Sequence, residues 1–353
     1  MQHLKTYDKH DILSVSKIRK YETKVGERIQ VAKYPNDLVA SLKESSAKFV
    51  LLGVPENIGV KANCGIGGTD SLWLSFLTAF LNIQSNDFLD GSEILLLGHL
   101  DFSEIEKLIE QNANQYEERV DAWRHAVHTI DESVEKVIQI ITQHKKLPLV
   151  IGGGHNNAYP CIKGAAKGWH KAGVIDLPQI NAINLDAHAD YRPTEGRHSG
   201  NAFRYAEEDG FLEKYCVIGI HENYIPQNVW IDMVNNPFLD CITYEDIFIH
   251  EKRTFIQAVS HATAFTSDTL TGIELDTDSI EFALSSASSP IGITAKNARK
   301  YLNYVSYDSK PAYLHICEGA TSLANGKQDD TTGKLVSYLV SDFIKGILQQ
   351  LAS

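Results

Sequence analysis

The segment INAINLDAHAD, Ile180–Asp190, joins a short apolar run to a cluster of ionisable residues. The run Ile180–Leu185 is typical of a strand that is buried on both faces of a parallel sheet. After it, Asp186, His188 and Asp190 alternate with alanines, so an extended backbone would place these three side chains on one side. Carboxylate and imidazole groups gathered at one strand end predict a metal site.

Apolar runs of the same kind recur along the rest of the chain. Each is short and rich in Val, Ile and Leu, and they lie at Phe49–Val54, Ile94–Leu97, Leu149–Ile151, Val217–Ile220, Leu270–Leu275 and Tyr313–Cys317. Helical spacing of apolar residues fills the intervals, most clearly at Tyr116–His144 and at Val336–Ile347 near the carboxyl end. This alternation predicts a three-layer αβα protein with a doubly wound, mainly parallel sheet. We expect one domain over residues 1–353, with residues 1–45 as an N-terminal extension.

Composition narrows the class of protein. The formal net charge of -12 argues against a nucleic-acid partner, because binding a polyanion needs a basic surface. No apolar run is long enough to span a bilayer, and the first residues lack the apolar centre of a signal peptide, so we expect a cytoplasmic protein without a membrane partner. The five cysteines form no C-x-x-C pair and are expected to be reduced core residues.

Two more apolar runs end in residues that can bind metals. The glycine-rich turn Gly152–Gly154 presents His155 after one run, and Asp276 and Asp278 follow another. In open α/β sheets ligands bind at the carboxyl ends of strands, so these residues are expected to meet the segment described first. Glu274 with Asp276 is an alternative register of the last pair. Each motif taken alone is common, and D-A-H-A-D could be a solvated turn.

Taken together, the three strand ends supply two imidazoles and four carboxylates. Four carboxylates in one pocket would repel one another, whereas two divalent cations would neutralise them. This mixture of donors suits Mn²⁺ or a similar ion, so we expect two divalent ions as cofactors. The expected ligands are His155, Asp186, His188, Asp190, Asp276 and Asp278.

The order G-G-x-H, D-A-H-x-D and D-x-D resembles the three metal-binding signatures of the arginase, agmatinase and formimidoylglutamase superfamily. Gly152–His155 is closer to the formimidoylglutamase form, since arginases usually have Asp where Gly154 stands. Gly53–Val60, Asp190–Pro193 and His198–Phe203 resemble the same branch. The family pattern divides the ligands between the two metals: His155 and Asp190 on one, His188 and Asp278 on the other, Asp186 and Asp276 on both.

The resemblance also implies roles in substrate binding and proton transfer. Glu318 follows the run Tyr313–Cys317, where the superfamily places a carboxylate that faces the cationic group of the substrate. Asp190 would also carry a proton from the attacking water to the leaving amine. Phe203 stands where arginase has a proton-shuttling histidine, which argues against arginase activity. The candidates for binding substrate carboxylates are Arg192, Ser199 and Asn201.

We therefore expect a metal-dependent hydrolase of linear amidine C–N bonds, with a small-molecule substrate. The favoured reaction converts N-formimidoyl-L-glutamate and water to L-glutamate and formamide, as in histidine degradation. One alternative is another ureohydrolase of the agmatinase, arginase or guanidinobutyrase type, and another is a catalytically silent protein with the same fold. The resemblance further implies a homo-oligomer.

Overall fold

The computed structural model describes residues 2–352, and its centre is one sheet of ten strands. The strands are β1 (Leu4–Thr6), β2 (Gln30–Val31), β3 (Phe49–Gly53), β4 (Ile94–Leu100), β5 (Leu147–Ile151), β6 (Ile180–Leu185), β7 (Leu212–Ile220), β8 (Leu239–Thr243), β9 (Thr271–Asp276) and β10 (Pro311–Cys317). Their spatial order is β1-β4-β3-β5-β10-β9-β6-β7-β8, with β2 also paired to β4. Among the pairings of these ten described strands, only that of β1 with β4 is antiparallel.

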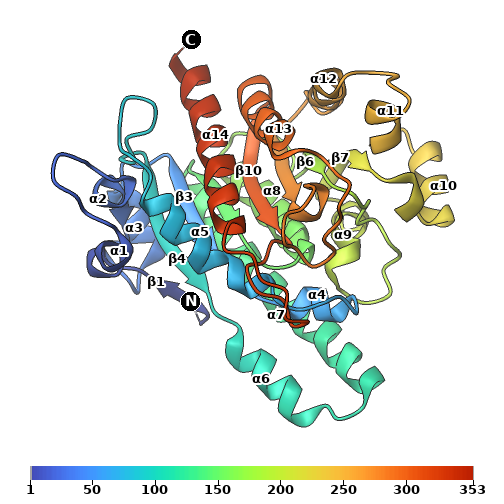
Figure 1. The fold of residues 1–353 in the computed structure, drawn as a ribbon, viewed down its shortest axis with the longest axis horizontal. Coiled ribbons are helices and arrows are strands. Elements are labelled where there is room, and N and C mark those ends of the chain that lie inside the picture. Colours follow the sequence, from blue (N-terminus) through green and yellow to red (C-terminus); the bar gives the residue numbers. More distant parts are fainter. Residues whose placement is uncertain (1, 353) are drawn as a thin grey trace.

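Helices cover both faces of the sheet (Figure 1). One face is covered by α3 (Leu38–Glu44), α4 (Ile58–Ala62), α7 (Tyr116–Gln143), α8 (Ala158–Lys171), α9 (Ala202–Glu208) and α10 (Gln227–Asn235). The other face is covered by α1 (Lys9–Val15), α2 (Val25–Arg28), α5 (Leu72–Leu81), α11 (Tyr244–Phe248), α12 (Phe255–Phe265), α13 (Ala295–Asp308) and α14 (Thr332–Ala352). The helix α6 (Ser103–Asn112) packs beside α7 and projects from the body. This confirms the predicted three-layer αβα fold.

The apolar runs form strands because their side chains alternate between two cores. In β3, Val50 and Leu52 join the core on one face, and Phe49 and Leu51 join the core on the other. All four side chains are almost fully buried. Burying each of them contributes about 1.5–3 kcal/mol to folding, so a strand between two helical layers needs apolar residues at every position.

The structure adds elements that the sequence patterns did not predict. β8 is an edge strand with the polar Asp240 as its second residue, so it is not a continuous apolar run. In the region of residues 2–45, β1 and β2 pair with β4, and Ile12 and Val25 are buried in the core. This region is therefore packed onto the sheet. No helix among the described residues has the length and apolar character needed to cross a membrane.

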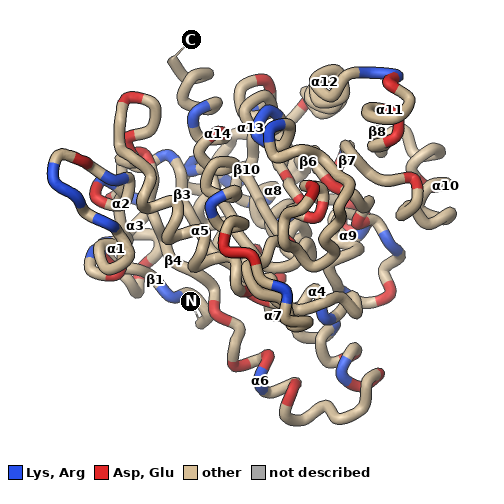
Figure 2. The backbone as a smooth tube through the Cα atoms, viewed as in Figure 1, with Lys and Arg blue, Asp and Glu red and all other residues tan. Residues whose placement is uncertain are grey.

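The sheet order gathers the motif-bearing strands. β5, β10, β9 and β6 are four consecutive neighbours in space, although they occur in the chain in the order β5, β6, β9, β10. All four run parallel, so their carboxyl ends meet at one edge of the sheet. In the view of Figure 2, Lys and Arg lie scattered among Asp and Glu on the outer helices and loops.

Candidate active site

A cavity of about 220 Å³ opens at the carboxyl edge of the central strands. Seven of the residues expected to act in the site line it: His188, Asp190, Arg192, Ser199, Asp276, Asp278 and Glu318. They come from segments that follow three neighbouring strands, β6, β9 and β10. The sheet therefore brings residues that are distant in the sequence to one hollow.

His155 lies buried beside the cavity with its ring directed at three carboxylates. Its Nδ1 atom is 2.8 Å from Asp190 Oδ2, 3.2 Å from Asp186 Oδ2 and 3.2 Å from Asp276 Oδ2. The candidate donor atoms of these four side chains all lie within 4.8 Å of one another, close enough to hold one ion. A nitrogen and three carboxylate oxygens suit a divalent cation such as Mn²⁺.

Tight turns, rather than extended chain, aim the carboxylates at this point. β6 ends at Leu185, and Asp186 Oδ1 accepts a 2.7 Å hydrogen bond from the backbone N–H of His188. In the same way, Asp276 Oδ1 accepts a 2.7 Å bond from the N–H of Asp278. These are Asx turns, in which the carboxylate binds the backbone two residues later. The backbone after Leu185 is therefore not the extended chain that would align Asp186, His188 and Asp190 on one side.

His188 and Asp278 complete the set from the open side of the site. His188 Nδ1 lies 3.6 Å from Asp186 Oδ1, and its side chain is 33% exposed. Asp278 Oδ1 accepts a 3.1 Å hydrogen bond from the backbone N–H of Ala287. Both residues line the cavity together with Asp276. Glu274, the alternative in the third motif, does not line the cavity. It is fully buried in β9, two residues before Asp276.

Burial and mutual repulsion dominate the electrostatics. Burial raises the pKa of Asp190, Asp276 and Asp278, and neighbouring carboxylates raise the pKa of Asp190 and Asp276 further. For Asp186, hydrogen bonds from the two histidines outweigh burial and lower the pKa. Against burial, contacts with Asp186 raise the pKa of His188 to about 10. Clustered carboxylates that resist ionisation are stabilised by a bound cation, so these residues fit the metal pair that the sequence predicts.

Glu318 forms the wall of the cavity next to His155. It adopts φ = 60°, a left-handed conformation that is uncommon outside glycine, and its N–H donates a 2.9 Å bond to Gly153. Its Oε1 accepts a 2.7 Å hydrogen bond from the backbone N–H of His155, and Ser286 Oγ donates to its Oε2. Burial and Asp278 raise the pKa of Glu318 to about 8.

A polar chain borders the cavity on another side. Arg192 Nη1 donates a 2.8 Å hydrogen bond to Asn63 Oδ1, and Asn63 Nδ2 donates a 3.2 Å bond to Ser199 Oγ. All three residues line the cavity. Arg192 is half exposed and also pairs with Glu195 at 2.8 Å. Its guanidinium is therefore accessible to an anionic ligand, which would compete with Glu195 for it.

The structure does not bring Asn201 to the cavity. Its side chain is fully buried, donates a 2.8 Å hydrogen bond to the carbonyl of Gly196 and accepts a 3.0 Å bond from Arg197 Nη1. His198 is equally buried, and its Nδ1 accepts a 3.1 Å bond from the N–H of Gly200. Burial and nearby arginines lower the pKa of His198 to about 3. Both side chains hold the local turn together, and neither lines the cavity.

Phe203, at the position where arginase has a histidine, is part of the core. Its ring stacks on Tyr215 with centroids 4.1 Å apart and meets the ring of His155 edge-on at 5.3 Å. It is fully buried and does not line the cavity. Its place in this structure is a packing position that backs His155.

Sequence patterns missed two polar residues that line the cavity, Tyr224 and Ser286. Tyr224 follows β7, and its ring lies 5.5 Å from that of His188, so the strand-end argument could have found it. Ser286 belongs to a loop between β9 and α13 that carries no recognisable spacing. Its contacts with Glu318 and Asp278 in the folded chain identify it.

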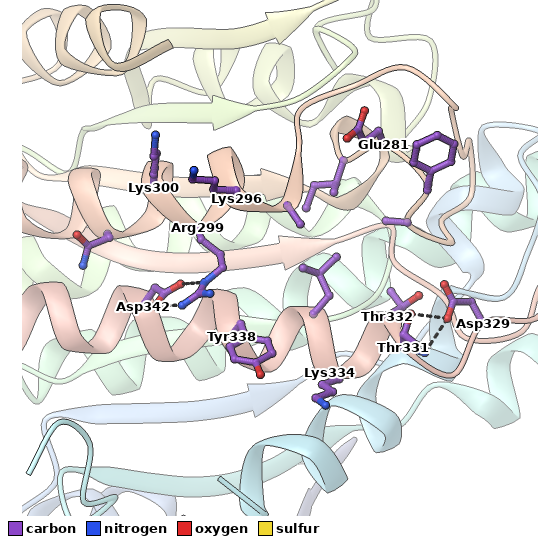
Figure 3. A pocket seen from close by; sticks show the side chains of 16 residues that line it. Glu281, Lys296, Arg299, Lys300, Asp329, Thr331, Thr332, Lys334, Tyr338 and Asp342 are labelled. Carbon is purple, nitrogen blue, oxygen red and sulfur yellow. Dashed lines mark hydrogen bonds and ion pairs between the residues drawn. The ribbon is translucent and has the colours of Figure 1, made fainter. Parts of the chain in front are cut away.

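A larger hollow of about 740 Å³ lies on the outer surface, where α13 meets α14 (Figure 3). None of the expected site residues lines it. Its Arg299 is paired with Asp342, with Nε 2.6 Å and Nη2 3.1 Å from the carboxylate oxygens, and Asp329 accepts a 2.7 Å hydrogen bond from Thr331 Oγ1. Because these groups partner each other, the cavity at the strand edge is the better candidate.

Comparison with known proteins identifies a family for this chain. The model of the Arginase family matches residues 48–344. A formimidoylglutamase of Streptococcus pyogenes serotype M6 is 24% identical over 206 residues, which is 56% of this chain and 61% of the relative. One from serotype M3 is 27% identical over 135 residues, 36% of this chain and 40% of the relative. The chain thus matches about half the length of these curated relatives.

Solved structures with low sequence identity share the fold. Formimidoylglutamase from Bacillus subtilis has a TM-score of 0.72 at 17% identity and covers 94% of each chain. A variant of Trypanosoma cruzi formiminoglutamase with Mn²⁺ has a TM-score of 0.69 at 18% identity, covering 93% of this chain and 98% of that one. Proclavaminate amidino hydrolase from Streptomyces clavuligerus has a TM-score of 0.68 at 14% identity, with 94% and 98% covered.

Proposed function

This chain belongs to the arginase family, hydrolases of amidine and guanidino C–N bonds, and we propose that its substrate is N-formimidoyl-L-glutamate. Water would cleave the C–N bond to give L-glutamate and formamide. The observation that carries this proposal is the layout of the cavity. The Glu318 carboxylate beside the metal ligands suits the cationic amidinium group, and Arg192 suits the carboxylates of the same molecule. The curated relatives named formimidoylglutamase support the same substrate.

The proposed cofactors are two divalent ions, with Mn²⁺ as the ion to test. His155 and Asp190 would hold one ion, His188 and Asp278 the other, and Asp186 and Asp276 would contact both. The pKa values raised by burial and repulsion support this set of ligands. When bound, such ions supply the Lewis acidity that ionises water near neutral pH.

The residues of this chain position the substrate and move its protons. Glu318 would pair with the amidinium nitrogens and hold the electrophilic carbon over the metal site. Asp190 would accept the proton of the attacking water and return it to the amine that leaves as glutamate. The raised pKa of Asp190 suits a group that must hold a proton for part of the cycle.

The other end of the substrate carries two carboxylates. Arg192 can meet one of them with a planar pair of N–H donors, and Ser199 and Asn63 add a hydroxyl and an amide. Asn201 is not proposed for this role, because its hydrogen bonds are satisfied inside the turn. From the family resemblance we also propose a cytoplasmic homo-oligomer, which light scattering on the purified protein would test for assembly.

The first experiment is to load the protein with Mn²⁺ and measure glutamate and formamide release from N-formimidoyl-L-glutamate. Agmatine and arginine are assayed in parallel with urea as the product. We expect glutamate release that is lost in Asp186→Ala and after metal removal. Urea release would transfer the proposal to a guanidino substrate. Two bound Mn²⁺ ions without turnover of any substrate would favour the catalytically silent alternative.

A further inference from the structure

A carboxylate lies buried directly beneath the proposed metal site. Glu274 and Asp276 are two residues apart in β9, so both side chains leave the same face of the sheet, with Glu274 roughly 7 Å deeper. Glu274 is fully buried between strands rather than exposed in the cavity. A charge in such a place needs specific partners, because burying an unpaired carboxylate is very costly.

The neighbouring strand β10 supplies two of these partners. Tyr313 Oη donates a 2.6 Å hydrogen bond to Glu274 Oε1, and His315 Nδ1 lies 2.7 Å from Oε2. His315 is the direct cross-strand neighbour of Glu274. Room for the phenol comes from Gly272, where an added Cβ would lie 2.5 Å from Tyr313 Oη. The sequence of both strands is thus adapted to hold this carboxylate.

The third neighbour is the first proposed metal ligand. Glu274 Oε2 lies 3.5 Å from His155 Nε2, and that nitrogen has no hydrogen-bond partner among the described residues. The other nitrogen of His155 faces Asp186, Asp190 and Asp276. The ring of His155 therefore has three carboxylates near Nδ1 and one near Nε2, and the thiol of Cys317 lies close by as well.

The two sides of this ring have different tasks. A neutral imidazole has one N–H and one lone pair, and a metal ion binds the lone pair. For Nδ1 to bind a cation, the proton must sit on Nε2, where Glu274 is the available acceptor. A small rotation of the ring would shorten 3.5 Å to a normal hydrogen bond of about 2.9 Å.

We propose that Glu274 is a positioning residue that holds His155 with its proton on Nε2 and its Nδ1 lone pair toward the cation. This inference rests on the metal centre of the proposed function but not on its substrate. The hydrogen bond formed by that rotation would fix the ring orientation and raise the basicity of the ligand. Removing such a partner weakens metal binding by roughly 10–100-fold.

The test is a Mn²⁺ titration of the whole chain. Binding is measured by calorimetry and by the electron paramagnetic resonance signal of free Mn²⁺. Glu274→Gln keeps the size of the side chain and removes its charge. We expect it to weaken the binding of one Mn²⁺ by roughly 10–100-fold and to leave the other unchanged. The matched control is Tyr313→Phe, which removes another hydrogen bond to the same carboxylate. It is expected to lower the urea midpoint of unfolding without changing either affinity.

A double-mutant cycle with His155→Asn separates positioning from general packing. If Glu274 acts through His155, Glu274→Gln should cause no further loss of Mn²⁺ affinity in the His155→Asn background. Should Glu274→Gln fold poorly, Glu274→Asp keeps the charge, withdraws it from His155 and should show the same single-site loss. Equal Mn²⁺ affinities of Glu274→Gln, Tyr313→Phe and wild type would overturn the inference.

Failure of this inference can be distinguished from failure of the proposed substrate. If the wild-type protein binds two Mn²⁺ ions but releases no glutamate, the proposed reaction is overturned. The double-mutant cycle of Mn²⁺ affinities still supports or overturns the role of Glu274. A wild-type protein that binds no divalent cation overturns both.

Discussion

The backbone N–H of His155 donates a 2.7 Å hydrogen bond to Oε1 of Glu318, across 163 residues of sequence. This bond joins the turn after β5 to the turn after β10, and the N–H of Glu318 returns a 2.9 Å bond to the carbonyl of Gly153. The same pair of turns thus holds His155, a proposed metal ligand, and Glu318, the carboxylate proposed to bind the substrate. A change in one is expected to be felt by the other.

Glu318→Gln tests the role of the carboxylate. The amide keeps a hydrogen-bond acceptor for the N–H of His155 but loses the charge that would pair with an amidinium. Loss of a charge-assisted hydrogen bond costs about 1.5–3 kcal/mol, so kcat/KM for N-formimidoyl-L-glutamate should fall by roughly 10–150-fold. Mn²⁺ content should stay at the wild-type level. In the control Ser286→Ala the charge stays in place, so kcat/KM should fall by less. Equal kcat/KM values for Glu318→Gln and wild type would exclude the proposed pairing.

Arg192→Ala tests recognition of the substrate's carboxylates. Removing the guanidinium should raise KM by roughly 10–100-fold with a small change in kcat, because the contact is made in both ground and transition states. Activity toward a simple N-alkylformamidine, which has no carboxylate, should not change. The control Glu195→Gln frees Arg192 from its ion pair and should lower KM. An equal loss on both substrates would place Arg192 in a structural role instead.

The stability of the metal-free protein should fall as pH rises. In the folded chain the pKa of Glu318 is raised from 4.5 to about 8, so this group stabilises the fold fully below 4.5 and loses that contribution as pH rises through about 8. The raised pKa of His188, about 10, acts in the same direction. We expect a lower Tm at about pH 8.5 than at about pH 6 in the presence of a chelator, and a smaller difference with Mn²⁺, because the cations replace the lost protons. A Tm independent of pH without metal would contradict this electrostatic description.

Phe203→His should not create a proton shuttle. Phe203 is buried between Tyr215 and His155 and does not reach the cavity. A histidine there would bury polar nitrogens without partners at a cost of about 1–3 kcal/mol, which urea unfolding would measure. We expect no gain in arginine hydrolysis. The control Phe203→Leu keeps the position apolar and shows how much of the loss comes from packing alone, whereas a gain in urea production would show that the ring can turn into the site.

The sequence by itself determined the kinds of residues and their local spacing. Seven strands and two long helices could be predicted, because burial on both faces of a sheet and the turn of a helix each impose a pattern on neighbouring residues. The same patterns of neighbouring residues identified His155, the D-A-H-A-D segment, the D-x-D pair and Glu318, since each follows an apolar run. It also named Asn201, whose proximity to these motifs in sequence says nothing about where its amide points.

Only the tertiary structure decided which of these residues meet. The order β5-β10-β9-β6 places His155 beside Glu318, and the path of the segment after β3 brings Asn63 to Ser199, 136 residues away. The tertiary structure also formed a turn directly after β6, and it put Glu274 beneath the site rather than in it. The reason is physical: spacing along a strand sets the face on which a side chain lies, whereas its neighbours across the sheet depend on how distant strands pair and pack.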